Sequence, residues 1–216
     1  MKFPSFLWAT FLFFLMSCRS DIHIDKDKVR DVLTQFGKEN PAKRILIETK
    51  IGNIEVRLYD ETPLHRANFV RNIQKGYYTD RGFYRIVKGV CIQGGSQRDP
   101  QDFTIPAEFN PKLINKRGAI AMARYTENNP GKESSATEFF IISKGRYYNE
   151  EELAKYPADL KKIYLEQGGE MLFDQEYTVF GEVTKGMDIV DKIAKDQVID
   201  KENPVHLIKF SIKVLD

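Results

Sequence analysis

Hydrophobic and polar residues alternate with a period of two in several segments of the chain. Residues 44–50 (RILIETK) and 53–59 (NIEVRLY) show this alternation on either side of Ile51 and Gly52, which predicts a β-hairpin. In residues 207–214, apolar side chains alternate with lysines and a serine, which predicts a strand with one buried and one solvated face. Four further segments have the composition of strands: residues 83–88, 118–124, 138–143 and 178–183.

Two segments place their apolar residues at helical spacing instead. In the first, Thr62 is the expected N-cap, Pro63 takes the first helical position and Gly76 ends the helix. The second covers residues 187–194, with Ile189, Val190 and Ile193 facing inward. Many short strands with two helices at opposite ends of the chain predict a mainly β fold, a closed antiparallel barrel, because closure leaves no exposed sheet edge.

A long segment between two predicted strands, residues 145–169, is rich in helix formers. Asn149 and Glu152 have the spacing of a capping pair, and Pro157 interrupts the pattern. An apolar stripe then continues to Gly168 and Gly169 and consists of Leu160, Ile163 and Tyr164. This segment is predicted to be a helical insertion in the barrel domain.

The residues before the first strand predict a tether, residues 18–43, that contains a short amphipathic helix. Gly37 is the expected end of this helix. Its apolar positions are Val29, Val32, Leu33 and Phe36. The helix could dock a partner protein, or it could pack against the domain as a spacer, and the second interpretation is favoured.

The first residues predict export from the cytoplasm. One lysine is followed by an apolar run that is too short for a comfortable transmembrane helix and fits a signal peptide over residues 1–17. The tetrapeptide LMSC resembles a bacterial lipobox, which implies lipidation of Cys18. We therefore expect a lipid-anchored protein of the bacterial cell envelope, facing the periplasm or the cell exterior. An uncleaved anchor or ordinary secretion are the alternatives, and both also place the domain outside the cytoplasm.

Composition excludes several classes of function. The 216 residues carry a formal net charge of +2 without a basic stripe, so nucleic acid is not an expected partner. The three histidines lie far apart, without the spacing of metal ligands, so neither a metal nor a cofactor is expected. Only two cysteines occur, and lipidation of one leaves Cys91 without a disulfide partner.

Four stretches, in this order, resemble the cyclophilins, a family of peptidyl-prolyl cis-trans isomerases. They are FYRIVKGVCIQGGS from residue 83, GAIAMAR from residue 118, SSATEFFIIS from residue 134 and YTVFGEVTKGMDIVDKI from residue 177. The resemblance runs through residues 44–216, interrupted by the helical insertion. It implies an eight-stranded barrel capped by two helices, with a peptide-binding groove on the outer surface and proline-containing polypeptides as clients.

The chemistry of such a site explains why an arginine belongs in the first stretch. An X-Pro bond resists rotation by about 18–20 kcal/mol because of amide resonance. A cation that hydrogen-bonds the prolyl nitrogen as it pyramidalises favours the twisted state, and Arg85 is charged at every working pH. Regular alternation would place Phe83, Arg85 and Val87 on one face of the strand. Taken alone, Arg85 could equally be a surface arginine.

The resemblance assigns roles to the other candidate residues. Gln93 hydrogen-bonds near Arg85 and the substrate backbone, and Phe140 forms the floor of the proline pocket, with Phe139 facing the opposite side. The backbone of Ala123 is implied to pair with the bound peptide as an added strand. Other positions are implied to surround the substrate: Val90, Cys91, Arg124, Glu138, Leu172, Phe173 and Tyr177.

Several of these positions depart from the usual residues of the family. Val90 stands where phenylalanine is common and Cys91 where methionine is common, which predicts a wider and less aromatic pocket. Leu172 replaces a frequent tryptophan and Tyr177 a frequent histidine. Cys91 is also either a reactive thiol beside the groove or a buried, inert cysteine, and the second is favoured.

A further departure is Glu138, which replaces the usual glutamine. Its carboxylate could form an ion pair with Arg85 or with Arg124, and so steady the guanidinium or divert it from substrate.

The sequence therefore predicts a monomeric, lipid-anchored peptidyl-prolyl cis-trans isomerase that assists the folding of extracytoplasmic proteins. Two alternatives stay open. One is a peptide-binding module or chaperone of the same fold with little catalysis. The other is a barrel lipoprotein with a small ligand inside, although the barrel of a cyclophilin should be filled by side chains.

Overall fold

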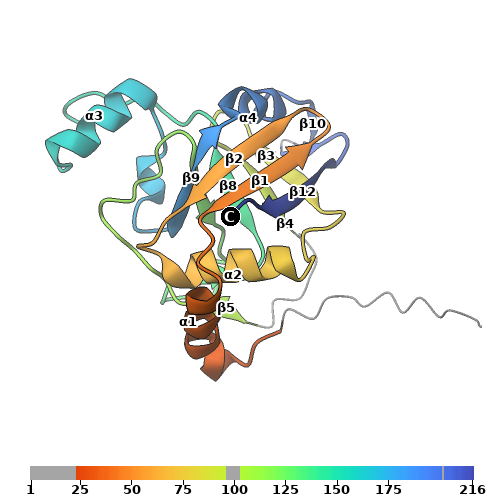
Figure 1. Ribbon diagram of the computed structural model, residues 1–216. Helices are drawn as coiled ribbons and strands as arrows, with labels where there is room; N and C mark the ends of the chain where they lie inside the picture. Colours follow the sequence, from red (N-terminus) through yellow and green to blue (C-terminus); the bar gives the residue numbers. More distant parts are fainter. Residues whose placement is uncertain (1–22, 96–102, 201) are drawn as a thin grey trace, which may run out of the picture.

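A computed structural model describes residues 23–95, 103–200 and 202–216, and its centre is a closed β-barrel (Figure 1). The barrel strands follow the order β1-β12-β3-β4-β8-β6-β9-β2, and each pairs with its neighbours in antiparallel fashion. Their bounds are Arg44–Thr49 (β1), Asn53–Leu58 (β2), Gly82–Val87 (β3), Cys91–Gly95 (β4), Ala119–Met122 (β6), Phe139–Ile142 (β8), Val179–Lys185 (β9) and Ile208–Val214 (β12). The predicted eight-stranded antiparallel barrel is confirmed.

The last strand closes the barrel between two strands from the first half of the chain. β12 pairs with β1 over Ile45 to Thr49, and with β3 at Gly82 and Phe83. Phe210 of β12 is buried, while the other apolar residues of the same face are partly buried against the core. The alternation in this segment therefore predicted its inward face correctly.

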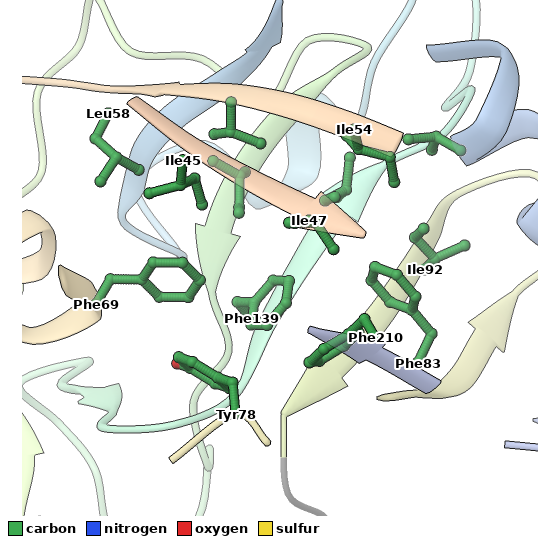
Figure 2. Packing of buried hydrophobic residues seen from close by; sticks show 14 of the residues in the cluster. Ile45, Ile47, Ile54, Leu58, Phe69, Tyr78, Phe83, Ile92, Phe139 and Phe210 are labelled. Atoms are coloured by element: carbon green, nitrogen blue, oxygen red, sulfur yellow. The ribbon is translucent and has the colours of Figure 1, made fainter. Parts of the chain in front are cut away.

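The barrel interior is filled with side chains (Figure 2). Aliphatic residues of β1 and β2 meet aromatic rings that pack edge to face, such as Phe69 on Phe139 and Phe83 on Phe210. All four rings are almost completely buried. The interior offers no room for a ligand, so the interpretation as a barrel with a small molecule inside is wrong.

Two helices cover opposite ends of the barrel, α2 (Pro63–Gln74) and α4 (Met187–Ala194) (Figure 1). Thr62 precedes α2, but its hydroxyl accepts no bond from the first turn. The carboxylate of Glu108 accepts from the backbone N–H groups of Leu64 and His65 instead, each at 3.0 Å. The cap predicted from the neighbouring residue is thus supplied by a residue more than forty positions away.

The predicted N-terminal helix exists and packs on the domain. The short 3-10 helix η1 (Lys26–Lys28) leads into α1 (Val29–Glu39), which lies against α2. Gly37 does not end α1, because it lies inside the helix, where a Cβ would stand 3.2 Å from that of Ala67. Val29 and Leu33 are buried, whereas Val32, another of the four apolar positions, is exposed.

The insertion folds around a small apolar cluster that also includes Ile114, which precedes β6. Its helix α3 (Ala158–Gln167) ends at Gly168, and Leu160 and Tyr164 are buried in this cluster. Asn149 and Glu152 cap each other as predicted, at 2.9 and 3.0 Å, although they stand in a series of turns before α3.

The insertion is joined to the rest of the domain by backbone bonds, such as that from the N–H of Arg117 to the carbonyl of Gly168 at 3.2 Å, and by the carboxylate of Asp174. Asp174 accepts hydrogen bonds from the hydroxyls of Tyr156 and Tyr164, both at 2.7 Å. Its other oxygen accepts from the backbone N–H of Asn115 at 2.7 Å. Asp174 follows Phe173 directly, so the insertion is bound to one of the segments that carry predicted site residues.

Five short elements escaped the sequence analysis. β5 (Thr104–Ile105) pairs with β7 (Ser134–Ser135), and β10 (Val198–Ile199) pairs with β11 (Asn203–Pro204). The 3-10 helix η2 spans Met171–Phe173. None of the helices in the described residues is long and apolar enough to cross a membrane. The predicted signal peptide, residues 1–17, and Cys18 lie outside the described residues.

Candidate active site

A β-bulge shapes the strand that carries Arg85. Phe83 pairs with Gly94 and Arg85 with Gln93, so Tyr84 is an extra residue on the β3 side. Phe83 consequently faces the barrel core, while Tyr84 and Arg85 both lie on the outer side, half-buried. The expectation that Phe83 and Arg85 share a face is wrong, because regular alternation ends at the bulge.

The guanidinium of Arg85 is held on two of its edges. Its Nη1 donates to Oε1 of Gln93 at 2.9 Å, and its Nε donates to Oε2 of Glu202 at 2.6 Å. The side chains of Arg85 and Glu202 are each 41% exposed. The contact with Glu202 raises the pKa of Arg85 further, so the group stays charged. Arg85 therefore presents a fixed cation at the surface of the barrel.

Behind Arg85 lies a network of neutral and acidic groups. The amide Nε2 of Gln93 donates to the hydroxyl of Tyr84 at 2.6 Å and to Oε2 of Glu138 at 3.1 Å. The Tyr84 hydroxyl in turn donates to the same carboxylate oxygen at 2.7 Å. Burial raises the pKa of Glu138, and the hydrogen bonds from Tyr84 and Gln93 oppose that shift.

The predicted ion pairs of Glu138 are not formed. Its carboxylate reaches Arg85 only through the amide of Gln93, because Gln93 bonds both of them. The carboxylate therefore neither steadies nor diverts Arg85 by direct contact. The carboxylate accepts from Nε2 of Gln93 and thereby orients this amide with its Oε1 toward the guanidinium of Arg85.

Beside Arg85 opens a cavity of about 400 Å³ on the outside of the barrel. Its apolar part is a cluster of three rings: Phe140 packs on Phe173 and Tyr177, with ring centroids 5.7 and 5.3 Å away. Residues from β3, β4, β8 and the loops after β6 and η2 line it: Arg85, Val87, Cys91, Gln93, Ala123, Arg124, Tyr125, Ser135, Glu138, Phe140, Phe173 and Tyr177. Its size and aromatic lining suit a proline ring together with neighbouring peptide groups.

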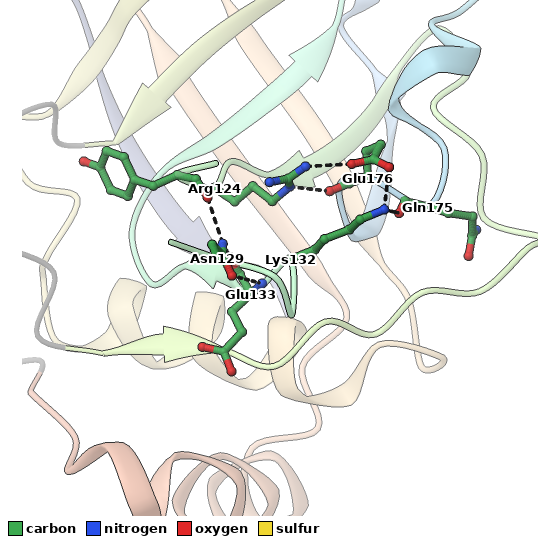
Figure 3. Close-up of polar contacts among 7 residues, drawn as sticks. Arg124, Asn129, Lys132, Glu133, Gln175 and Glu176 are labelled. Atoms are coloured by element: carbon green, nitrogen blue, oxygen red, sulfur yellow. Dashed lines mark hydrogen bonds and ion pairs between the residues drawn. The ribbon is translucent and has the colours of Figure 1, made fainter. Parts of the chain in front are cut away.

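An ion-pair cluster joins the two loops that flank the cavity (Figure 3). Arg124 donates to the backbone oxygen and to the carboxylate of Glu176, at 2.8 and 2.7 Å. Lys132 binds the other carboxylate oxygen of Glu176 and the backbone oxygen of Gln175. These bonds hold the pKa of Glu176 below its usual range. Arg124, whose guanidinium also lies 5.2 Å from the ring centre of Tyr177, thus braces the pocket wall.

Most of the predicted site residues line this one cavity, with two exceptions. Val90 lies in the turn between β3 and β4 and packs on the cluster behind the cavity. Leu172 is 72% exposed and is not part of the lining. Phe139 and Phe140 face opposite sides, as expected, one in the core and one in the cavity wall.

Ala123 differs from its expected role in one respect. Its backbone N–H donates to the carbonyl of Glu138 and its carbonyl accepts from the N–H of Ser135, both at 2.8 Å. The N–H has a single proton, so it cannot also serve a bound peptide while this bond lasts. The carbonyl oxygen of Ala123 keeps a second lone pair, so pairing with a bound peptide through this oxygen stays a prediction.

Cys91 lines the wall of the cavity, and its thiol has low reactivity. It is buried, and burial raises its pKa to about 12. The thiolate, which is the reactive form, is therefore scarce at neutral pH. This favours the interpretation of Cys91 as an inert cysteine.

Four residues near the reacting position were missed from the sequence. Ser135 lies within a stretch that carried the family resemblance and Tyr125 directly follows one, but their types gave no specific signal. Tyr84 was assigned to the opposite face, because a bulge leaves no trace in one strand alone. Glu202 lies in a turn far along the chain. Within the described residues, no group of acidic, histidine or cysteine side chains could hold a metal ion.

Comparison with known proteins agrees with this geometry. The profile of the family described as cyclophilin type peptidyl-prolyl cis-trans isomerase/CLD matches residues 44–213. The peptidyl-prolyl cis-trans isomerase A of Dickeya dadantii is 35% identical over 162 residues, which cover 72% of this chain and 73% of that protein. The peptidyl-prolyl cis-trans isomerase of Acinetobacter baylyi is 30% identical over 185 residues, covering 79% and 85%. The chain therefore belongs to the cyclophilin family of peptidyl-prolyl cis-trans isomerases, and it is an enzyme of that class.

Solved structures support the fold. A cyclophilin type isomerase of Cryptosporidium parvum matches with a TM-score of 0.62 at 20% identity, over 81% of this chain and 98% of that one. The same protein has also been solved in the presence of the dipeptide Ala-Pro, and that structure matches with a TM-score of 0.61.

Proposed function

We propose that Arg85 catalyses the isomerisation of X-Pro bonds without a covalent step, and that the clients are extracytoplasmic proteins during folding. The observation that carries the mechanism is the position of its guanidinium, which is held by Gln93 at the edge of a cavity floored by Phe140. The proline ring fits against the three aromatic rings, which places the prolyl nitrogen toward the cation.

The reaction needs no nucleophile and no metal. Uncatalysed exchange takes tens to hundreds of seconds because the planar amide must lose its resonance. As the bond twists, the prolyl nitrogen becomes a better hydrogen-bond acceptor, and a donor that waits there stabilises the twisted state more than either planar one. Of the five guanidinium donors of Arg85, two are occupied by Gln93 and Glu202, which leaves three for the substrate.

The decisive experiment is a proline-isomerisation assay of the purified protein and of Arg85→Ala. Removal of a preorganised donor from a developing charge typically costs about 10²–10³ in rate. We expect a loss of this size in kcat/KM, with the thermal midpoint unchanged, because Arg85 lies outside the barrel core. Activity of Arg85→Ala equal to that of the wild type would exclude the mechanism.

A second candidate is a peptide-binding module with weak catalysis. The ion pair between Arg85 and Glu202 favours it, because the carboxylate offsets part of the charge that the twisted amide should feel. A wild-type protein that binds an Ala-Pro peptide but leaves its exchange rate unchanged would establish this alternative.

We further propose that the protein acts as a monomer tethered to the bacterial envelope by a lipid on Cys18. The support is the apolar N-terminal run followed by Cys18. Metabolic labelling with a fatty acid should mark the wild type and not Cys18→Ser, and the variant should be recovered without detergent. Equal labelling of both would contradict the anchor, and a dimeric mass in solution would contradict the monomer.

A further inference from the structure

We infer that Glu202 is a positioning residue for Arg85, which sets the plane of the guanidinium in the groove. This inference rests on the proposed role of Arg85. It concerns a residue that lies 117 positions after Arg85 and outside the motifs that define the family resemblance. Glu202 does not line the cavity, so its effect on the reaction would pass through Arg85.

The two contacts of the guanidinium have different consequences for its orientation. The bond from Nη1 to Gln93 fixes one corner and by itself permits the planar group to swing about that point. The bond from Nε to Glu202, at 2.6 Å, fixes a second edge. A planar group held at two edges has one orientation, and the remaining donors then point in a constant direction. Catalysis by a hydrogen-bond donor depends on that direction.

The backbone places Glu202 next to Arg85 independently of the side-chain contact. The carbonyl of Glu202 accepts a hydrogen bond from the N–H of Ile86 at 2.7 Å, one residue beyond Arg85. Glu202 stands in the turn between β10 and β11. In this pair of strands Val198 is opposite Pro204 and Ile199 is opposite Asn203, and β11 lies against β3. Replacing the side chain should therefore leave the turn in place.

Glu202 is also the carboxylate that pairs with Arg85 among the described residues. Glu138, which lines the cavity, is bonded to Tyr84 and Gln93. The guanidinium thus lies between an amide that is itself fixed and a carboxylate on the opposite edge. Loss of Glu202 would leave Arg85 charged and attached to Gln93, but free to reorient.

The test compares Glu202→Ala and Glu202→Gln in the purified full-length protein. For an Ala-Pro peptide we expect Glu202→Ala to lower kcat about three- to tenfold, while the peptide Kd stays within twofold, since orientation matters in the twisted state. Glu202→Gln keeps an acceptor for Nε and should recover at least half of the lost rate. In NMR spectra, the Nε–H signal of Arg85 should be sharp and slow to exchange in the wild type, and broadened in Glu202→Ala.

A matched control exists at an ion pair outside the cavity. Arg117 donates to Asp191 at 2.6 Å, and their side chains are 28% and 36% exposed, so the pair resembles Arg85–Glu202 in length and exposure. Neither residue lines the cavity beside Arg85. Asp191→Ala should leave kcat and the Arg85 signal unchanged.

A double-mutant comparison separates the outcomes. In the Arg85→Ala background, Glu202→Ala should change the rate less than twofold. An equal loss in both backgrounds would show that Glu202 acts elsewhere and would overturn the inference, as would a wild-type kcat in Glu202→Ala while Arg85→Ala is impaired. Wild-type activity in Arg85→Ala would reject the proposed function, and the inference with it.

Discussion

Among the hydrogen-bonded networks of polar side chains in the described residues, two have opposite relations to solvent. In the first, His65 is fully buried, its Nδ1 lies 2.6 Å from Glu108 and its Nε2 lies 2.9 Å from Ser134. In the second, Arg85 is joined through Gln93 to Glu138 and Tyr84, beside an open cavity.

By residue type alone, the buried chain looks more like a catalytic site. A serine, a histidine and an acid at these distances are the components of a hydrolytic triad. Yet Ser134 is buried, and it is not among the residues that line the cavity beside Arg85. The carboxylate of Glu108 is also engaged in capping α2. This chain therefore joins α2 to β7 and contributes to stability.

The groove chain has the reverse properties. Its acid and amide are buried and bonded to each other, and the amide ends on a cation that retains donors beside a cavity. The comparison teaches that access and unused hydrogen-bonding capacity, rather than a set of reactive residue types, distinguish a site from a structural network.

The largest expected effect belongs to the buried chain. His65→Ala leaves Ser134 and one edge of Glu108 without their partner inside the protein, so the free energy of unfolding should fall by about 3–5 kcal/mol. Urea unfolding at low temperature measures it, and His206→Ala, at an exposed position, should change it by less than about 0.5 kcal/mol. The kcat/KM of the folded fraction should not change. A lower kcat/KM of His65→Ala with an unchanged free energy of unfolding would show that the buried chain, and not the groove chain, is the functional one.

A smaller effect on stability is expected in the groove, and it depends on pH. Burial raises the pKa of Glu138, so this group favours the folded state below its ordinary value of 4.5 and loses that contribution as pH rises through the folded pKa. Glu138→Gln should therefore be more stable than the wild type at pH 7, by about 1 kcal/mol, and equally stable near pH 4. Thermal unfolding at both pH values checks this. A variant that is less stable at pH 7 would contradict the direction.

The smallest effect concerns the hydroxyl that links the acid and the amide. Tyr84→Phe removes the bond to Glu138 and releases Gln93 from one partner. We expect kcat to fall about two- to fivefold, with less than about 1 kcal/mol change in unfolding free energy, because the half-buried ring keeps its packing. Tyr147→Phe is the control, since Tyr147 is exposed and lies outside both this network and the cavity lining. An equal loss in both variants would argue against the network.

Local pattern predicted those parts of the fold that local forces determine. Alternation identified the inward face of β12, and the apolar spacing of Ile189, Val190 and Ile193 identified the buried face of α4. Asn149 and Glu152 were recognisable as a capping pair because both partners lie within one turn. Family resemblance identified Arg85, Gln93 and Phe140, because members of a family share the fold that brings these positions together.

What the sequence could not show depends on partners distant in the chain. Tyr84 turns outward because β3 carries one residue more than β4 across the pair, which is a property of two strands together. Thr62 is a residue type common at N-caps, but the carboxylate of Glu108 accepts the hydrogen bonds of the first helical turn instead. Glu202 has no distinguishing local signal, and its importance appears only once a turn of β10 and β11 lies against β3.

The place of β12 between β1 and β3 has a consequence for the timing of folding. β12 is the last barrel strand to be synthesised, and the turn with Glu202 is made just before it. A nascent chain that still lacks this segment has seven strands with an unpaired gap beside β3, the strand that carries Arg85. The enzyme should therefore gain its activity in one late step, once β12 has been synthesised and has closed the barrel.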